Sequence, residues 1–169
     1  FEAPTVARLA ARAESRADTG RVALTAQSRP QRIPLSYAQQ RMWFLNRLEP
    51  DSAAYSIPIL LRLSGQLNLD ALCAAIEDVL NRHEVLRTVY PYTDGEPSQV
   101  VLPAAEVIAP MTVASVAKPE LAESLSAFVS TVFDVTVEAP VRVRLFEISR
   151  HERVLAVVAI GLGLLALRA

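Results

Sequence analysis

The stretch 69–90, LDALCAAIEDVLNRHEVLRTVY, has the most regular pattern in the chain. In its first half, apolar residues recur at steps of three and four and therefore share one face of a predicted amphipathic helix: Leu69, Leu72, Cys73, Ile76, Val79 and Leu80. Asn68 or Asp70 is suited to cap the start of this helix. After His83 the pattern predicts a strand that contains Val85, Leu86, Val89 and Tyr90. The stretch thus predicts a unit of helix, tight turn and strand whose apolar face requires a larger core.

The composition predicts one globular domain with a tail. The chain has 169 residues, of which 51% are hydrophobic, enough to form one sizeable core. A net charge of -1, from 17 basic and 18 acidic residues, argues against binding to nucleic acid or to an anionic membrane. The single cysteine, Cys73, excludes an internal disulfide framework and is compatible with a reducing cytosol. We expect Cys73 to be a core residue, because no neighbouring cation or base would stabilise a thiolate.

The other patterns predict a mixed α/β domain behind a tether. Residues 6–13 have a short helical pattern, and 15–34 have the composition of a linker. A second helix is expected over 36–48. The strand expected over 55–64 is apolar at nearly every position, which predicts that both its faces are covered and that Pro58 lies at its start or on a sheet edge. Further elements are predicted along the chain: a hairpin turn at 93–96, an edge strand within 107–116, a helix over 121–132, a strand with one polar face over 141–146 and a buried strand over 154–158.

Two motifs within this pattern resemble the first two signatures of condensation domains from nonribosomal peptide synthetases. They are SYAQQRMWFL at 36–45 and RHEVLRT at 82–88, and the segments YSIP, RLSG and EAPVRVRLF also look like family sequence. The resemblance implies a chloramphenicol-acetyltransferase-like lobe, an α/β fold with a mixed sheet flanked by helices. It assigns 35–169 to the N-terminal one of two lobes, truncated at the catalytic motif. The motif residues are expected to have structural roles: Ser36, Gln39, Arg41, Trp43, Arg82, His83, Glu84 and Arg87.

The catalytic signature of that family has no counterpart here. In condensation domains, the strand that resembles 154–158 leads into His-His-x-x-x-Asp-Gly, and an imidazole suits the proton transfer that an attacking amine requires. In this chain, 159–166 reads AIGLGLLA, without histidine or aspartate. His83 lies in the second signature, where a structural hydrogen bond is expected, and His151 lies among charged residues of a predicted surface turn. The sequence therefore predicts no catalytic residue, no cofactor-binding residue and no metal ligand.

The N-terminus implies a carrier domain as neighbour and partner. FEAPTVARLA, at 1–10, looks like the last helix of a peptidyl carrier domain, which assigns 1–14 to that helix and 15–34 to the linker. The serine that carries phosphopantetheine in such domains would lie upstream, so no prosthetic group is assigned to this chain. The expected partners are carrier domains with their tethered aminoacyl groups. Because the chain begins at Phe1 without an export signal, we expect a piece of a longer cytoplasmic polypeptide.

Three interpretations of the whole chain remain open. The first is a synthetase fragment, inactive alone, whose parent domain condenses a donor aminoacyl or peptidyl thioester with an acceptor amine. The second is a non-catalytic module that docks carrier domains. The third is a peptide held at a membrane by the apolar run 154–167, although fourteen residues are fewer than the ~18 to 20 that cross a bilayer. The altered end has two explanations of its own, a frameshift before the histidines or a natural domain that lost catalysis.

Overall fold

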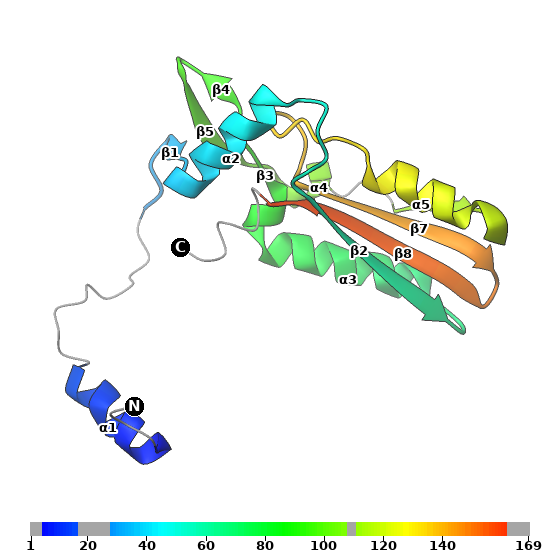
Figure 1. Ribbon diagram of the computed structural model, residues 1–169, viewed down its shortest axis with the longest axis horizontal. Helices are drawn as coiled ribbons and strands as arrows, with labels where there is room; N and C mark the ends of the chain where they lie inside the picture. The colour runs from blue at the N-terminus through cyan, green and yellow to red at the C-terminus, as the bar shows by residue number, and fades with distance from the viewer. Residues whose placement is uncertain (1–4, 17–27, 108–110, 162–169) are drawn as a thin grey trace. The chain divides into compact units, whose positions relative to one another are not determined.

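The computed structural model describes residues 5–16, 28–107 and 111–161 (Figure 1). The chain divides into two compact units, Phe1–Pro30 and Gln31–Ala169. In the first unit, the described residues include helix α1 (Val6–Arg16), whose apolar residues Val6 and Leu9 are exposed. The predicted helix is therefore present in this unit, while the assignment of 1–14 to a carrier domain and of 15–34 to a linker stays a prediction.

The larger sheet of the second unit is mixed, with the strand order β2-β8-β7-β6. Its strands are β2 (Ser56–Ser64), β8 (Glu152–Ile160), β7 (Val141–Ser149) and β6 (Thr112–Ser115). The pairs β2–β8 and β8–β7 are antiparallel, whereas β6 and β7 are parallel. A parallel pair requires a crossover connection. Here the 3-10 helix η2 (Lys118–Glu120) and helix α5 (Leu121–Val129) provide it. The expected fold class, α/β with a mixed sheet flanked by helices, is confirmed.

A smaller sheet is centred on strand β5 (Glu96–Val101). This strand pairs with β1 (Ile33–Pro34), β3 (Thr88–Val89) and β4 (Tyr92–Thr93). The turn between β4 and β5 places Asp94 at φ 54° and Gly95 at φ 85°. Two successive residues with positive φ match the right-handed twist of a tight hairpin, and Asp-Gly is a favoured pair for that conformation. The predicted hairpin turn is confirmed.

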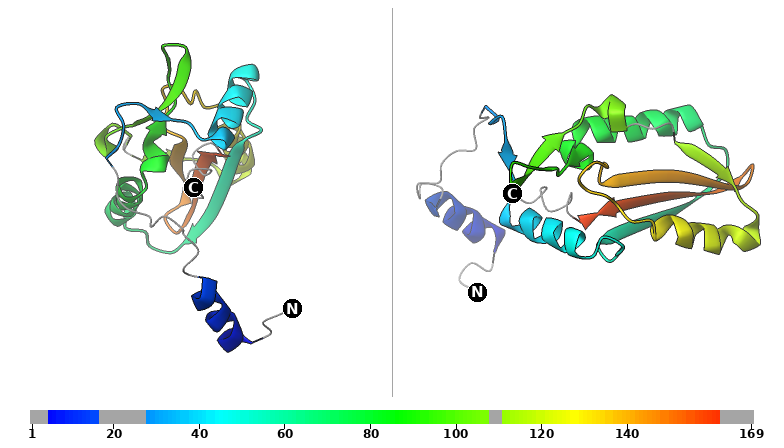
Figure 2. Two further views of the ribbon diagram at one scale, coloured as in Figure 1. Left: turned by 90° about the vertical axis from the view of Figure 1, so that its left-hand side faces the viewer. Right: turned by 90° about the horizontal axis from the view of Figure 1, so that it is seen from above.

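Helices α2 (Tyr37–Leu48), α3 (Leu69–Arg82) and α4 (Ala104–Val107) complete the unit. Asn68 rather than Asp70 caps α3, because the Asn68 side chain accepts a hydrogen bond of 3.0 Å from the Ala71 N–H. Helices α3 and α5 lie on opposite sides of β7 and β8 (Figure 2). The main core lies on the α5 side and combines β8 side chains with aromatic rings from the surrounding elements: Val154, Ala156, Val158 and Ile160 with Tyr90, Phe128, Phe133 and Phe146.

The segment after α3 differs from the prediction. Residues Glu84–Arg87 form a 3-10 helix, η1, and the strand β3 begins only at Thr88. The Leu86 N–H donates to the His83 carbonyl, and the Thr88 hydroxyl donates to the Glu84 carbonyl over 2.8 Å. These local hydrogen bonds stabilise a helical turn. The apolar residues of the segment gave no indication of this turn, because they fit a strand equally well.

Two burial predictions are wrong. Cys73 is exposed, because α3 presents mainly the narrow row of Leu72, Ile76 and Leu80 to the rest of the unit. Strand β2 was expected to be covered on both faces, but it lies at a sheet edge and its apolar side chains are largely exposed. An edge position does agree with the alternative stated for Pro58.

The apolar run at 154–167 begins as a strand. Strand β8 extends to Ile160 and is mostly buried, which confirms the predicted buried strand. The end of the run, 162–167, lies outside the described residues. Among the helices that the structure describes, none is long and apolar enough to cross a membrane.

Candidate functional site

The two signature segments meet at the C-terminal end of β8. Helix α2, which carries the first signature, contributes Met42 and Trp43 to the surroundings of the main core, and Tyr90, which follows the second, lies in that core with Ile160. At the next residue, the Gly161 N–H donates to the Tyr55 carbonyl over 3.0 Å. A methyl group on Gly161 would lie 3.6 Å from the Met42 Cε atom. The segment that stands in place of the catalytic motif thus starts beside both signatures.

Trp43, in the first signature, contacts the segment that follows the second signature. Its indole Nε1–H donates to the Tyr90 carbonyl over 3.0 Å. Its ring also stacks on Tyr92, with 5.5 Å between the ring centroids and 18° between the planes. Helix α2 is thereby fixed against the short strands that follow the RHEVLRT motif.

Ser36 and Gln39 form a capping box at the start of α2. The Gln39 N–H donates to the Ser36 hydroxyl oxygen over 3.3 Å, and the Ser36 N–H donates to the Gln39 side-chain oxygen over 2.9 Å. The buried Gln39 amide group also donates to the Gln99 side-chain oxygen over 3.3 Å, and the Gln99 amide group donates to the Pro34 carbonyl over 2.8 Å. Hydrogen bonds therefore connect the start of α2 to strands β5 and β1 of the smaller sheet.

Arg87, in the second signature, binds residues both inside and outside that motif. Its Nε–H donates to the Leu80 carbonyl at 3.1 Å, and its Nη1–H donates to the Leu102 carbonyl at 2.6 Å. The Glu84 carboxylate lies 3.6 Å from Arg87 Nη2. The guanidinium group thus ties the last turn of α3 to the end of β5, with a carboxylate that matches its charge.

The other predicted residues lie outside this network. Arg41 and Arg82 have exposed side chains. His83 is half-buried, and its hydrogen bonds with described residues are made by its backbone: the His83 N–H donates to the Val79 carbonyl, and the His83 carbonyl accepts from Leu86. His151 is exposed, as expected, and its carbonyl accepts a hydrogen bond from the Gly65 N–H. The structural role assigned to the His83 side chain stays a prediction.

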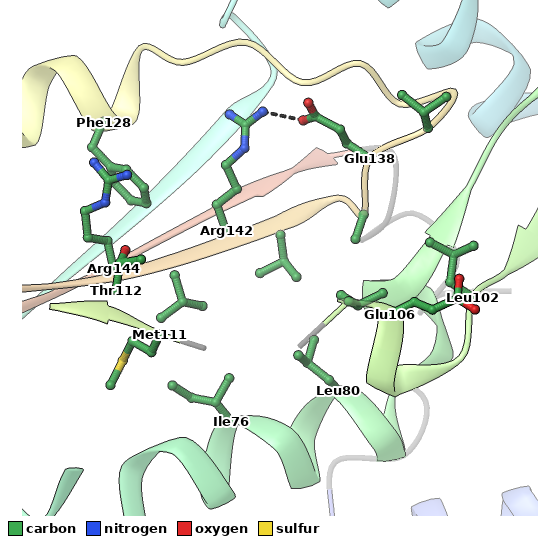
Figure 3. A pocket seen from close by; sticks show the side chains of 15 residues that line it. Ile76, Leu80, Leu102, Glu106, Met111, Thr112, Phe128, Glu138, Arg142 and Arg144 are labelled. Carbon is green, nitrogen blue, oxygen red and sulfur yellow. Dashed lines mark hydrogen bonds and ion pairs between the residues drawn. The ribbon is translucent and has the colours of Figure 1, made fainter. Parts of the chain in front are cut away.

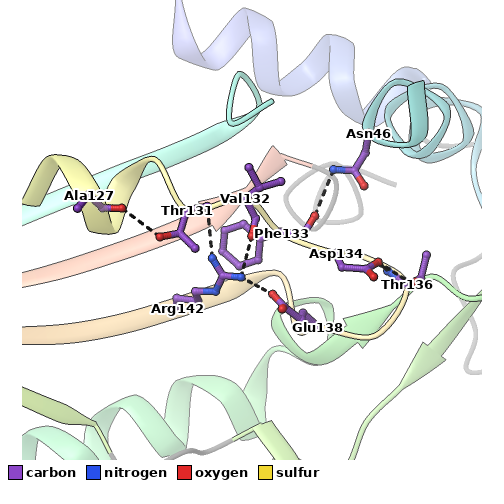
Figure 4. Close-up of polar contacts among 9 residues, drawn as sticks. All are labelled: Asn46, Ala127, Thr131, Val132, Phe133, Asp134, Thr136, Glu138 and Arg142. Carbon is purple, nitrogen blue, oxygen red and sulfur yellow. Dashed lines mark hydrogen bonds and ion pairs between the residues drawn. The ribbon is translucent and has the colours of Figure 1, made fainter. Parts of the chain in front are cut away.

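Gln39 was expected from the sequence as a motif residue, whereas Asn46 and Gln99 were not singled out. Asn46 is buried and donates from its side chain to the Phe133 carbonyl over 3.4 Å (Figure 4). Gln39 and Asn46 lie three or four residues from Met42 and Trp43, so helical spacing placed them on the same inward face. That spacing was the signal available for both. No local pattern identified Gln99.

Tyr90 is a titratable residue in the core of this site. Burial raises the pKa of its phenol to about 12, and the neighbouring Gln39 side chain opposes this increase. The Tyr90 hydroxyl has no hydrogen-bond partner among the described residues. A phenol with such a pKa stays protonated at neutral pH and is unsuited to accept a proton from an amine.

A cavity of about 410 Å³ opens beside this region, between α3 and β7 (Figure 3). Ile76 and Leu80 line one wall, and Val141, which pairs with Ala159 of β8, lines the other. Arg142 lines the cavity as well, but it is already fully engaged: it pairs with Glu138, donates to the Thr131 and Val132 carbonyls and stacks over the Phe133 ring (Figure 4).

The described residues at this site provide packing and hydrogen bonds rather than reactive groups. Ala159 and Ile160 are buried at the end of β8, and 162–166 lie outside the described residues. Within the described part of the chain, no group of three or more His, Cys, Asp or Glu side chains is placed to hold a metal ion.

Comparison with known proteins identifies the family. The family model described as "Condensation domain" matches residues 30–159. The chain belongs to the condensation-domain family. A probable non-canonical nonribosomal peptide synthetase, CymA of Salinispora arenicola, is 44% identical over 160 residues, which are 94% of this chain and 2% of that protein. A dimodular nonribosomal peptide synthase of Bacillus subtilis is 42% identical over 155 residues, or 92% of this chain and 6% of that protein.

Solved condensation-domain structures agree with this assignment. The X-domain in its complex with OxyB from teicoplanin biosynthesis is 36% identical, has a TM-score of 0.75 and matches 83% of this chain and 30% of that one. A starter condensation domain of the rhizomide synthetase RzmA, at 20% identity and a TM-score of 0.68, supports the fold alone. This condensation-domain chain thus spans a small share of the curated synthetases and about a third of the solved domains.

Proposed function

We propose that this chain is a structural part of a nonribosomal peptide synthetase and that it does not form amide bonds by itself. The parent reaction joins a donor aminoacyl or peptidyl thioester to an acceptor aminoacyl amine, with both substrates held on the phosphopantetheine arms of carrier domains. The observation that carries the proposal is the end of β8. There the chain has aliphatic residues where the family has its histidines and aspartate, and the nearby phenol of Tyr90 has a pKa of about 12.

The chemistry of the parent reaction supports this proposal. An amine attacks a thioester only when it is unprotonated, and it loses a proton as the amide forms, so a group that titrates near neutral pH accelerates the step. The contacts around the two signatures, with Trp43 bonded to the Tyr90 carbonyl and Arg87 bonded to the Leu80 carbonyl, form a scaffold that would hold such a group. The chain therefore retains the support of a condensation site without its reactive residues.

A condensation assay tests the proposal. The purified chain is mixed with two carrier domains that bear aminoacyl groups, and an intact condensation domain serves as the positive control. We expect product from the control and none above the uncatalysed background from this chain. Enzyme-dependent amide product from the chain alone would refute the proposal.

A second candidate function, carrier docking without catalysis, is favoured by the outer face of α2. This helix buries Gln39 and Asn46 but exposes Tyr37, Phe44 and Leu48, at 92%, 60% and 62%. These three residues follow helical spacing and lie on one exposed face of α2 together with Arg41, and exposed apolar side chains commonly mark interaction surfaces.

A binding titration separates docking from an inert scaffold. An isotope-labelled carrier domain is titrated with the chain and with its Phe44→Glu variant. Saturable binding that the variant weakens supports docking, while spectra that do not change with added chain exclude it. The exposed Glu123→Gln change on α5 is the matched control for an altered charge and should leave any binding intact.

A further inference from the structure

Strand β1 lies where the chain enters the second unit, which begins at Gln31. Three of the four residues in 31–34 are exposed, and Ile33 is half-buried. The next residue, Leu35, is 5% exposed and belongs to the main core. The apolar attachment of the chain to the core therefore begins at Leu35, and residues 31–34 lie before it as a strap on the surface of the smaller sheet.

The backbone of the strap contributes a single hydrogen-bonded pair to the sheet. The ladder pairs Ile33 with Gln99 and Pro34 with Ser98. Proline has no N–H, and the Ser98 N–H donates to the Pro91 carbonyl over 3.1 Å, so Pro34 and Ser98 form the pair without hydrogen bonds. Because the two kinds of pair alternate in an antiparallel ladder, Ile33 and Gln99 exchange both of their backbone hydrogen bonds.

Side chains add three hydrogen bonds to the strap. Arg32 Nη2 donates to the Thr93 carbonyl over 2.6 Å and to the Glu96 carbonyl over 2.8 Å, at the two ends of the β4–β5 turn. The Gln99 amide group donates to the Pro34 carbonyl over 2.8 Å. All three bonds are exposed. A segment with exposed hydrogen bonds and few buried apolar contacts opens at a lower free energy than the fold around it.

The strap is connected to the first signature through Gln99. The Gln99 side-chain oxygen accepts a hydrogen bond of 3.3 Å from the buried Gln39 amide group, and the Gln39 side-chain oxygen accepts one of 2.9 Å from the Ser36 N–H. When the strap leaves β5, Gln99 loses the Pro34 carbonyl that orients it toward Gln39. The capping box of α2 and the strap therefore stabilise one another, since a coupling free energy acts in both directions.

We propose that residues 31–34 form a detachable strap held by Arg32, and that its attachment stabilises the first turn of α2 through Gln99. Detachment adds four residues to the chain that leads into Leu35, a reach of at most about 14 Å. The N-terminal part of the chain thus has a short and a long attachment to the second unit, and the stability of the first signature differs between them. This inference does not depend on the proposed function, since no step of the amide chemistry enters it.

Amide hydrogen exchange of the unmodified chain, resolved by residue, tests the detachment. The Gln99 N–H points to the strap, whereas the Ser98 N–H of the same strand donates to the Pro91 carbonyl on the other side. We expect Ile33 and Gln99 to share one protection factor, at least about tenfold below that of Ser98. Equal protection of Gln99 and Ser98 would mean that the strap opens only together with the hairpin, and it would overturn the proposal.

Arg32→Met tests the side chain that holds the strap. This variant keeps the length of the side chain but removes both hydrogen bonds to the β4–β5 turn, so the protection of the Ile33 and Gln99 amides should fall about five- to tenfold. Arg150→Met, the same change at an exposed residue of another hairpin, is the matched control and should leave both amides unchanged. Unchanged protection of Ile33 and Gln99 in Arg32→Met would overturn the proposal.

The Gln39 amide, which donates to the Ser36 hydroxyl oxygen, reports the coupling to α2. Its protection should also fall in Arg32→Met. In a Gln99→Met background, the same Arg32 substitution should leave the Gln39 amide unchanged, because the connecting side chain is gone. A Gln39 amide that keeps its protection while the strap loosens, or an effect that persists without Gln99, would overturn the coupling.

Discussion

Replacement of Tyr90 by phenylalanine tests the energetics of the junction between the two signatures. The Tyr90 side chain is fully buried, and its hydroxyl has no hydrogen-bond partner among the described residues. Burial of an unpaired hydroxyl costs about 1–3 kcal/mol in proteins. The phenylalanine ring keeps the packing of the tyrosine, so Tyr90→Phe should raise the free energy of unfolding by about 1 kcal/mol near neutral pH.

The same hydroxyl predicts a loss of stability in alkali. The pKa of Tyr90 rises from 10.0 to about 12 on folding, because burial disfavours the phenolate. Between these two values the unfolded chain loses the proton while the folded chain retains it. The folded state then binds more protons, so the free energy of unfolding falls as the pH rises. Two pH units at about 1.4 kcal/mol each correspond to about 3 kcal/mol. The stabilisation is fully present below pH 10 and is lost toward pH 12.

Urea unfolding followed by circular dichroism measures both effects. The wild-type chain and Tyr90→Phe are compared near neutral pH and at several values between pH 10 and 12, where the variant should lack this part of the alkaline loss. Tyr92→Phe, at an exposed tyrosine, is the control and should stay within about 0.5 kcal/mol of wild type near neutral pH. If Tyr90→Phe is instead destabilised by more than about 1 kcal/mol near neutral pH, the hydroxyl is paired and the reasoning is wrong.

Three further substitutions test individual contacts of the site by the same unfolding measurement. Ser36→Ala should cost about 1 kcal/mol through loss of the helix cap, and Ser36→Asp should restore most of it. Trp43→Phe should cost about 1–2 kcal/mol, because the Tyr90 carbonyl loses its donor; an unchanged stability would exclude a contribution from that hydrogen bond. Arg87→Met should cost about 2–3 kcal/mol, since two carbonyls lose a charged donor, and Arg87→Lys should recover little because an ammonium group lacks the forked geometry.

Features set by neighbouring residues could be predicted from the sequence. The three- and four-residue spacing of Leu72, Ile76 and Leu80 defines α3, and Asn68 and Ser36 have the side chains that cap helices. The Asp-Gly pair of the hairpin turn is equally local, since positive φ values favour these residues. The resemblance to condensation domains rested on motifs of the same kind, contiguous and short.

Features set by distant residues could not be predicted in this way. Strand β2 is as apolar as a buried strand. Its exposure depends on which other elements cover it, and the sequence of the strand does not specify those elements. Gln39 and Asn46 are polar and buried because their partners, Gln99 and Phe133, approach from elements far along the chain. The predicted burial of Cys73 was wrong for the same reason, since the elements that pack against α3 determine how wide a face of the helix is buried.

The position of β8 in the larger sheet has a consequence for synthesis on the ribosome. Strand β8 lies between β2 and β7, yet it is the last of these strands to be translated. Until residue 160 has emerged from the ribosome, β2 cannot pair with β8. Its isoleucine and leucine side chains therefore stay exposed in the nascent chain. Pairing across such a long sequence separation is slow and leaves apolar segments open to aggregation. We therefore expect chaperone binding to concentrate on the interval between the emergence of β2 and that of β8.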